Sequence, residues 1–575
     1  MLEAPEKGSI PKLLLLVIAF IQGLMLLAIY RALDNHSWPW QQPVYLYPLL
    51  SFAVVTPILC LLSFVQGQIL HYAKWIGIFT VCLLLVAGYT GWQLEPGDKV
   101  ESSSIGFIFI WTSVIASFKA LMYIQQRGSG QAISYSALFR YSWRNFLVLA
   151  LSLLFTLIFW GILYLCGALF KVINIDFIAT LIKHDWFYIP VLTLAHGFGV
   201  LIFRNLANII DTIAKILQVL MKFLLPALLL IAIAFLAALP FTGLQTLWGT
   251  GKGSMLILWL QVLVLFFVNA VYQDESHIFP YPRLIHRAIY CGIALLPIYS
   301  IIASFGLYAR IEQYGLSVER CWALLLWALL FLFALGYLWG IVRKQDQWVE
   351  KLSRVNITMG LIVLALMVLV NSPILDFRKI SLASQMHRFD SGVTTITNLD
   401  VNYIDKHLGR NGYLTLESLK IKYASSNPEF IKRIDSAMKR YDSSQKSTKP
   451  TLQEFTQLIT KSPDELQIPE LLLSSIYAKE NEYSLNFDQL YMIQTDLNGD
   501  GAAEYVFLKT NENWWIATMW VLVNDKWISR NMNHTQLRNQ HDFGRLLKEH
   551  GVEIIKSEWQ RLKIGDITFT VSEHE

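Results

Sequence analysis

Eleven long apolar segments occupy the first two thirds of the chain. A helix that crosses the hydrocarbon core of a bilayer needs about 20 mostly apolar residues. Because lipid offers no hydrogen bonds, a spanning segment has to pair its own backbone groups as a helix. The sequence therefore predicts a mainly α polytopic membrane protein with about eleven transmembrane helices. The candidate spans are residues 13–32, 44–66, 72–92, 104–125, 145–168, 186–203, 218–241, 254–272, 284–308, 320–341 and 355–374.

The sixth segment decides the parity of the crossings, because it is short and contains Pro190, His196, Gly197 and Gly199. Alternate loops, beginning with the N-terminus, carry 15 Lys and Arg residues, and the opposite set carries 7. Loops rich in Lys and Arg face the cytoplasm, so we expect a cytoplasmic N-terminus and, after eleven crossings, an extracytoplasmic C-terminal domain. With ten crossings, the basic stretch 343–354 would face the extracytoplasmic side, against this rule.

Charge divides the chain into two bodies. Only 15% of its residues are charged, against about 25% in soluble domains. Residues 1–374 contain 15 acidic and 23 basic residues, whereas the remaining 201 contain 27 acidic and 24 basic. The net charge of +5 therefore reflects basic loops at a membrane surface and gives no indication of nucleic-acid binding. The bilayer is the one partner that the composition predicts directly.

The tail divides again by pattern. We predict a transmembrane domain over 1–374, an extracytoplasmic helical segment over 375–485 and a small β-rich domain over 486–575, so that the tail is an α+β domain. Helix-period stretches include "PEFIKRIDSAMKRY" and "TLQEFTQLITKS", and alternation typical of strands begins near 486. Asn524-Asp525 and Gly565-Asp566 are predicted hairpin turns. All five cysteines lie in apolar segments, so the tail has neither a disulfide framework nor a thiolate metal site.

The stretch "TDLNGDGAAEYVFL" in the β-rich domain has the spacing of a calcium loop. An EF-hand is excluded, because its twelfth position, which requires Glu, is Phe507. The shorter D-x-N-x-D-G-x-x-E pattern resembles the nine-position calcium loops of propeller repeats. That resemblance implies calcium as a possible cofactor, and the alternative is a tight turn capped by its own Asp and Asn side chains. The candidate ligands are Asp496, Asn498, Asp500, the carbonyl of Ala502 and Glu504.

A second polar cluster lies between the ninth and tenth spans, in "GLYARIEQYGLSVER". Arg310 and Arg320 sit at the predicted outer mouth, interleaved with Tyr308 and Tyr314. Charge so close to the hydrocarbon is usually paired or reaches the interface, which predicts an interfacial hairpin that turns at Gly315. The alternative is a cavity mouth where arginines meet an anionic group, a lipid head or the tail domain.

The same stretch resembles a bacterial inner-membrane family, domain of unknown function 4153. The shared R-(I/V)-x-x-Y-G-L-(T/S)-x-x-R motif corresponds to Arg310, Tyr314, Gly315, Ser317 and Arg320, and the segment after the last span matches at Asp376, Arg378 and Arg388, among others. One departure is Glu275, where the family pattern has Gly. The resemblance covers residues 1 to about 420. It implies a bacterial inner (cytoplasmic) membrane location and no activity.

Polar residues inside the spans include Lys119, His196, Gln261 and Asn269. A lone amide or imidazole in a span more often bridges two helices than binds a ligand, and Lys119 is expected to reach the inner interface.

Two functions remain open at this point. Phosphate-loop, nucleophile-elbow, zinc-protease and dinucleotide motifs are missing from the sequence, so no catalytic residue is predicted and the chain is more readily a non-enzymatic envelope binding, sensing or scaffold protein. Its partner would be an envelope protein or an anionic lipid. The alternative is a permease or membrane-embedded transferase that takes an anionic or lipid substrate through an outward-facing mouth lined by Arg310, Arg320 and Arg388.

Overall fold

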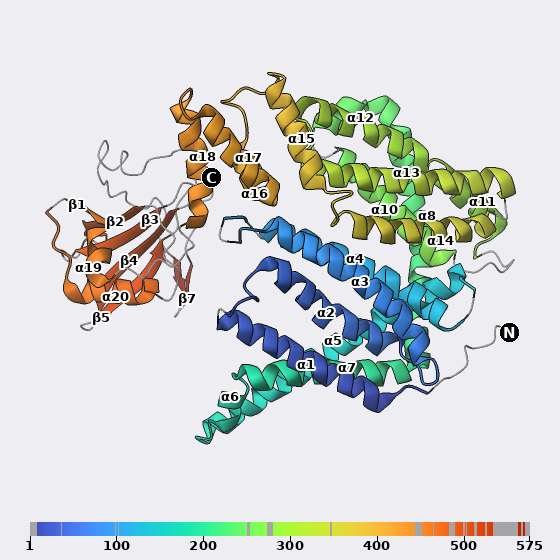
Figure 1. Cartoon of the computed structure of the whole chain (residues 1–575), viewed down its shortest axis with the longest axis horizontal. Coiled ribbons are helices and arrows are strands. Elements are labelled where there is room, and N and C mark those ends of the chain that lie inside the picture. The colour runs from blue at the N-terminus through green and yellow to red at the C-terminus, as the bar shows by residue number, and fades with distance from the viewer. Residues whose placement is uncertain are drawn as a thin grey trace. The chain divides into compact units, whose positions relative to one another are not determined.

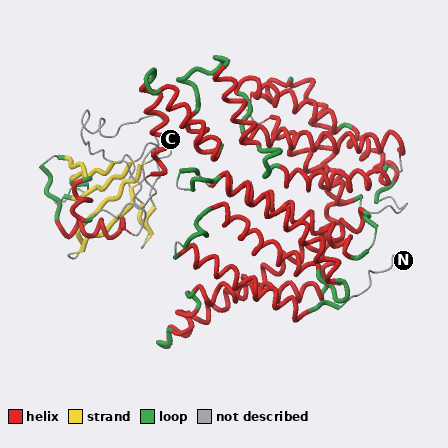
Figure 2. Tube along the Cα trace, viewed as in Figure 1, coloured by secondary structure: helices red, strands yellow, loops and turns green. Residues whose placement is uncertain are grey.

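The computed structural model describes most of the chain (Figures 1 and 2). It forms two compact units, Met1–Tyr441 and Asp442–Glu575, which are treated separately below. The described residues are 9–35, 37–97, 99–101, 103–130, 132–249, 253–272, 280–345, 348–442, 451–463, 465–481, 489–497, 499, 501, 503–510, 515–523, 526–532, 562–564 and 567–569.

The first half of the membrane body is a bundle of apolar helices in which α1 packs on α7, α2 on α3, and α5 on α7 (Figure 1). Its core includes Leu15, Leu59, Ile76 and Val200. The helices are α1 (Lys12–Asp34), α2 (Pro43–Ser63), α3 (Ile69–Gln93), α4 (Ser103–Gly128), α5 (Tyr135–Val172), the short α6 (Phe177–Leu181) and α7 (Asp185–Asn205).

The second half has its own core, which includes Leu229, Val264, Tyr299 and Tyr337. Helix α14 packs on both α13 and α4, so it joins the two halves. The helices are α8 (Ala207–Thr242), the short α9 (Leu244–Gly249), α10 (Gly253–Val271), α11 (Arg283–Ala294), α12 (Leu296–Tyr314), α13 (Val318–Lys344) and α14 (Val349–Leu369).

All eleven predicted spans are confirmed as helices long and apolar enough to cross a membrane, with α11 and α12 together forming the ninth. The sixth is a continuous helix, α7, despite Pro190. Gly197 allows close packing of α7 on α1, because a Cβ at this position would lie 2.5 Å from the Cβ of Ala19. Gly197, one of the residues that are unusual in a membrane span, is therefore the residue that lets α7 approach α1.

A helical cap continues the first unit beyond α14. It consists of α15 (Phe377–Asp390), α16 (Val401–His407), α17 (Gly409–Tyr423) and α18 (Pro428–Asp442). Its core, which includes Phe389, Leu408 and Phe430, is continuous with Val318 at the start of α13 and Val370 just after α14. The cap therefore packs on one end of the membrane helices.

The second unit is an α+β domain built on a five-stranded sheet of order β1-β2-β3-β4-β5. Strand β1 is parallel to β2, and the other neighbours are antiparallel. Strands β6 and β7 form a separate hairpin. The elements are α19 (Leu452–Gln457), β1 (Ile459–Ser462), α20 (Glu470–Asn481), β2 (Gln489–Thr495), β3 (Glu504–Thr510), β4 (Trp515–Val523), β5 (Lys526–Met532), β6 (Leu562–Ile564) and β7 (Ile567–Phe569).

The two predicted hairpins are consistent with the pairing of Val523 with Lys526 and of Ile564 with Ile567; their four turn residues lie outside the described part of the chain. The helix-period stretch 451–462 forms a helix only as far as Gln457. Ile459–Ser462 instead pairs with β2, because a long-range strand partner outweighs a weak local preference for helix.

Candidate functional site

One face of α15 binds the turn between α12 and α13. Ser384 Oγ accepts a hydrogen bond from the Leu316 N–H at 3.0 Å, and Gln385 Nε2 donates to the Leu316 carbonyl at 2.9 Å. Ser381 Oγ donates to the same carbonyl at 3.1 Å. These positions recur every three or four residues, so they share one face of the helix. We call this group the latch: Ser381, Ser384, Gln385 and Arg388.

Arg388 completes the latch at the C-terminus of α12. Its guanidinium donates to the carbonyls of Glu312 at 2.9 Å and Gln313 at 2.8 Å. The last carbonyls of a helix lack partners within the helix, and a cation near that end is favoured by the helix dipole. Arg388 therefore satisfies polar groups that would otherwise be left open at the end of a membrane helix.

The conformation of the turn explains why the motif contains Gly315 and Ser317. Gly315 has φ +74° and ψ −177°, a region that is essentially restricted to glycine. A Cβ there would lie 2.7 Å from Cδ of Arg388. Ser317 begins α13 as its N-cap, accepting a hydrogen bond from the Arg320 N–H at 3.3 Å.

The predicted arginine cluster is assembled around the ring of Tyr314. The guanidinium carbons of Arg310 and Arg320 lie 5.9 and 5.3 Å from the ring centroid. Arg320 also donates to the Gly315 carbonyl at 2.8 Å. Two of the three arginines of the proposed mouth thus bind backbone carbonyls: Arg320 that of Gly315 in the turn, and Arg388 those at the end of α12.

The other matched residues form a second site where the cap meets α3. Asp376 caps α15 and accepts hydrogen bonds from the Arg378 N–H at 3.0 Å and from its Nε at 2.9 Å. Tyr89 Oη and Gln93 Nε2 donate to its other oxygen at 2.8 and 3.1 Å. Asn411 donates to Gln93 Oε1 at 3.2 Å, which ties α17 to the same point. Both members of the ion pair are buried.

A comparison with known families matches this part of the chain. The family model described as "Domain of unknown function (DUF4153)" matches residues 49–419. The chain belongs to this family. No curated protein matches it, and no solved structure does.

The DUF4153 match includes the latch, its turn and the Asp376 site, and it ends within α17. The second unit, with the predicted calcium loop, lies outside the match. What the DUF4153 chain shares with its family is therefore the membrane body from within α2 onward, together with most of the cap; α1 lies outside the match.

The loop at 496–504 connects β2 and β3 and is partly described. The Asp496 carboxylate accepts hydrogen bonds from the Gly499 N–H at 2.7 Å and the Gly501 N–H at 2.9 Å, and Glu504 accepts one from the Leu497 N–H at 2.7 Å. Asn498, Asp500 and Ala502 lie outside the described residues. Within the described ranges, no three His, Cys, Asp or Glu side chains form a group that could hold a metal. Calcium binding by this DUF4153 chain stays a prediction.

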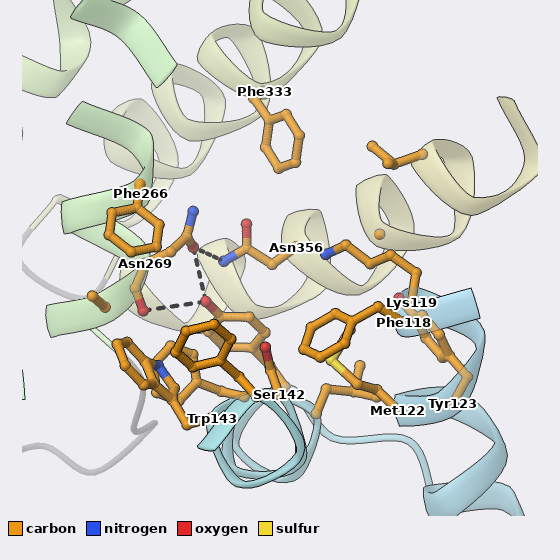
Figure 3. Close-up of a pocket in the computed structure, with 17 residues that line it drawn as sticks. Phe118, Lys119, Met122, Tyr123, Ser142, Trp143, Phe266, Asn269, Phe333 and Asn356 are labelled. Atoms are coloured by element: carbon orange, nitrogen blue, oxygen red, sulfur yellow. Dashed lines mark hydrogen bonds between the residues drawn. The ribbon is translucent and has the colours of Figure 1, made fainter. Parts of the chain in front are cut away.

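Of the polar residues within spans, Gln261 is a bridge between helices: it is buried and donates to the Leu296 carbonyl at 2.7 Å and Ser300 Oγ at 2.8 Å. Asn269 joins three other side chains in a similar bridge, described below. His196 is half-buried. Lys119 lines a pocket inside the membrane body (Figure 3).

Sequence reasoning missed Tyr89, Gln93 and Ser384 as partners of the matched residues. The only available signal was polarity at the ends of helices. Tyr89 and Gln93 are one turn apart at the end of an otherwise apolar span, which puts two hydrogen-bonding groups on one face near the interface.

Proposed function

We propose that this DUF4153 protein is a non-enzymatic envelope protein whose membrane body holds the cap and the second unit on the extracytoplasmic side of a bacterial inner membrane, for binding or sensing. The observation that carries this proposal is the latch. Four side chains of α15 bind the backbone of the α12–α13 turn, and the Asp376 site fastens the cap to α3. Such a cap is a rigid extension of the bundle. It suits a platform, by which we mean a membrane-anchored support that presents the second unit to a binding partner.

The hydrogen bonds of the arginine side chains favour a platform over the alternative, a permease or transferase with an arginine-lined entrance. An entrance for anions needs guanidinium groups that face the substrate. Arg320 and Arg388 instead donate to carbonyls of Gly315, Glu312 and Gln313. The amide Nε2 of Gln261, a buried polar group within the bundle, donates to α12 rather than to a substrate path.

Accessibility of single cysteines tests the sidedness. All five native cysteines would be replaced, and one cysteine would be introduced at Ser391, which is exposed just after α15. The matched control is Asn208→Cys, exposed near the start of α8, at the opposite end of the bundle. In intact bacterial cells, a membrane-impermeant maleimide is expected to label S391C and not N208C. The reverse pattern refutes the proposed topology.

Calcium titration of the full-length protein tests the binding part separately. We expect saturable heat at about 10⁻⁴ to 10⁻³ M calcium, as for extracellular modules. The Asp496→Ala variant should lose it, and Glu465→Gln, an exposed carboxylate of the same unit outside the loop, should retain it. Absence of heat in the wild type would leave the platform standing and reduce the loop to a turn.

A further inference from the structure

A pocket of about 470 Å³ lies where the two halves of the membrane body meet. Its lining residues come from α4, α5, α10, α13 and α14. The volume falls within the range of about 300–1,000 Å³ that is common for small-molecule sites. Its lining residues lie at the C-terminal end of α10, in the N-terminal third of α5 and in the C-terminal half of α4, so the pocket lies in the half of the bundle opposite the latch.

The walls of the pocket are mainly aromatic. Phe118, Trp143 and Phe333 line it together with Phe146 and Phe266 (Figure 3). Phe146 and Phe266 are 54% and 49% exposed and belong to the membrane helices α5 and α10. Because the outside of a membrane bundle faces lipid, the rim of the pocket is open to acyl chains rather than to water.

Lys119 is the single charged residue among the lining residues that the structure describes. It lies nine residues before the end of α4 at Gly128, about 14 Å along the helix axis. Figure 3 shows its side chain running into the pocket toward Asn356. No hydrogen bond or ion pair joins it to any other described residue. An intramembrane cation is costly unless it is paired, so an anion is the ligand class that this lysine favours.

The neighbouring polar groups do not neutralise this charge. Tyr135 Oη donates to Asn269 Oδ1 at 2.8 Å, and the Tyr337 hydroxyl lies 3.0 Å from the same oxygen and 2.6 Å from Asn356 Oδ1. The amide of Asn356 donates to Asn269 Oδ1. These side chains bind one another and fix one wall of the pocket. Ser142 adds a hydroxyl beside it.

We propose that this pocket binds an anionic phospholipid, with Lys119 as the counter-charge of the phosphate and the aromatic wall against its acyl chains. The lipid-facing rim favours a membrane lipid over a soluble anion. The pocket also lies toward the end of the bundle whose loops carry the excess of basic residues, and basic pockets between helices on that side of a membrane bind anionic head groups. The proposal does not depend on the platform function or on calcium.

Lipid retention by the full-length protein is the test. The protein is reconstituted in nanodiscs of phosphatidylglycerol and phosphatidylcholine in equal parts, extracted into mild detergent and analysed by native mass spectrometry. Wild type and Lys119→Arg are expected to retain phosphatidylglycerol selectively. Lys119→Met should lower that retention by at least about fivefold, the equivalent of about 1 kcal/mol per Lys near a lipid head group. Lys215→Met, which removes an exposed basic residue of α8 outside the pocket, is the matched control and should behave as wild type.

Three results would overturn the proposal. The first is equal retention of the two lipids by the wild type. The second is an unchanged preference in K119M, or the same loss in K215M. The third is displacement of phosphatidylglycerol by millimolar inorganic phosphate, which would identify a soluble anion as the ligand. Should K119M fail to fold, Ser142→Phe, which fills the pocket and leaves the charge, has to abolish the wild-type preference.

Discussion

The ion pair of Asp376 and Arg378 allows a quantitative prediction. Asp376 is 2% exposed and Arg378 is 8% exposed, and the carboxylate accepts four hydrogen bonds, from Arg378 twice, Tyr89 and Gln93. Asp376→Ala leaves the guanidinium buried without its anion and α15 without its N-cap. Removing one member of a buried pair costs about 3–5 kcal/mol, so the population of the opened cap should rise about 150- to 5,000-fold.

Hydrogen exchange measured by mass spectrometry on the full-length protein in nanodiscs reports this opening directly. Amide exchange in α15–α17 should accelerate by that factor, and exchange in α1 and α7 should not change. The matched control is Asp435→Ala, in the same cap. Its pair with Lys420, at 2.8 Å, is about one third exposed, so it contributes about 0–1 kcal/mol and the acceleration should stay below about fivefold.

The reasoning fails if D376A accelerates exchange in the cap by less than about tenfold. A second variant tests the cause. Asp376→Leu with Arg378→Met removes both charges, and exchanging a buried pair for apolar residues of similar size is often close to neutral. If the double variant opens as much as D376A, the unpaired charge is not what destabilises the cap.

Three further predictions concern single positions. Gly315→Ala should destabilise the latch by about 1–3 kcal/mol, because its backbone conformation is restricted to glycine and a Cβ would meet Arg388; cap exchange as fast as in wild type would contradict this. Gln261→Leu should cost less than about 1 kcal/mol in unfolding titrations, as expected for a hydrogen bond between membrane helices, and a larger loss would indicate a further role. The pKa of Glu454 is lowered from 4.5 by the Thr451 N–H and hydroxyl of its capping box. Its stabilisation of the second unit is therefore present above pH 4.5 and lost as the pH falls through the lowered pKa. Glu454→Gln should reduce the melting temperature at neutral pH, and the difference from wild type should shrink as the pH falls through the lowered pKa of Glu454.

The matched motif illustrates how much of the site was predictable. Arg310, Tyr314, Gly315 and Arg320 are close in sequence, and the sequence correctly predicts a hairpin that turns at Gly315. The role of Arg388 was not predictable, because its acceptors are backbone carbonyls 75 and 76 residues away. Every residue has a backbone carbonyl, so the sequence does not distinguish an arginine that binds a carbonyl from an arginine that binds a substrate.

The pocket shows the same limit. The sequence identifies Lys119 as an intramembrane cation, and a lysine at this depth is expected to reach the interface. The direction of the Lys119 side chain depends on the packing of α4 against α14, whose Asn356 lies more than 200 residues away in the chain. Helix periodicity places residues on faces of one helix but does not say which other helix each face meets.

The sequence by itself determined the eleven membrane helices and the α+β tail. Lipid permits few backbone conformations, and the required length and apolarity of a span are properties of contiguous residues. Only the tertiary structure decided which polar groups are satisfied. Ser384 and Arg388 meet the end of α12, Asp376 meets Tyr89, and Lys119 faces a pocket without a described partner. Each of these facts depends on side chains from distant segments that come together only when the helices pack.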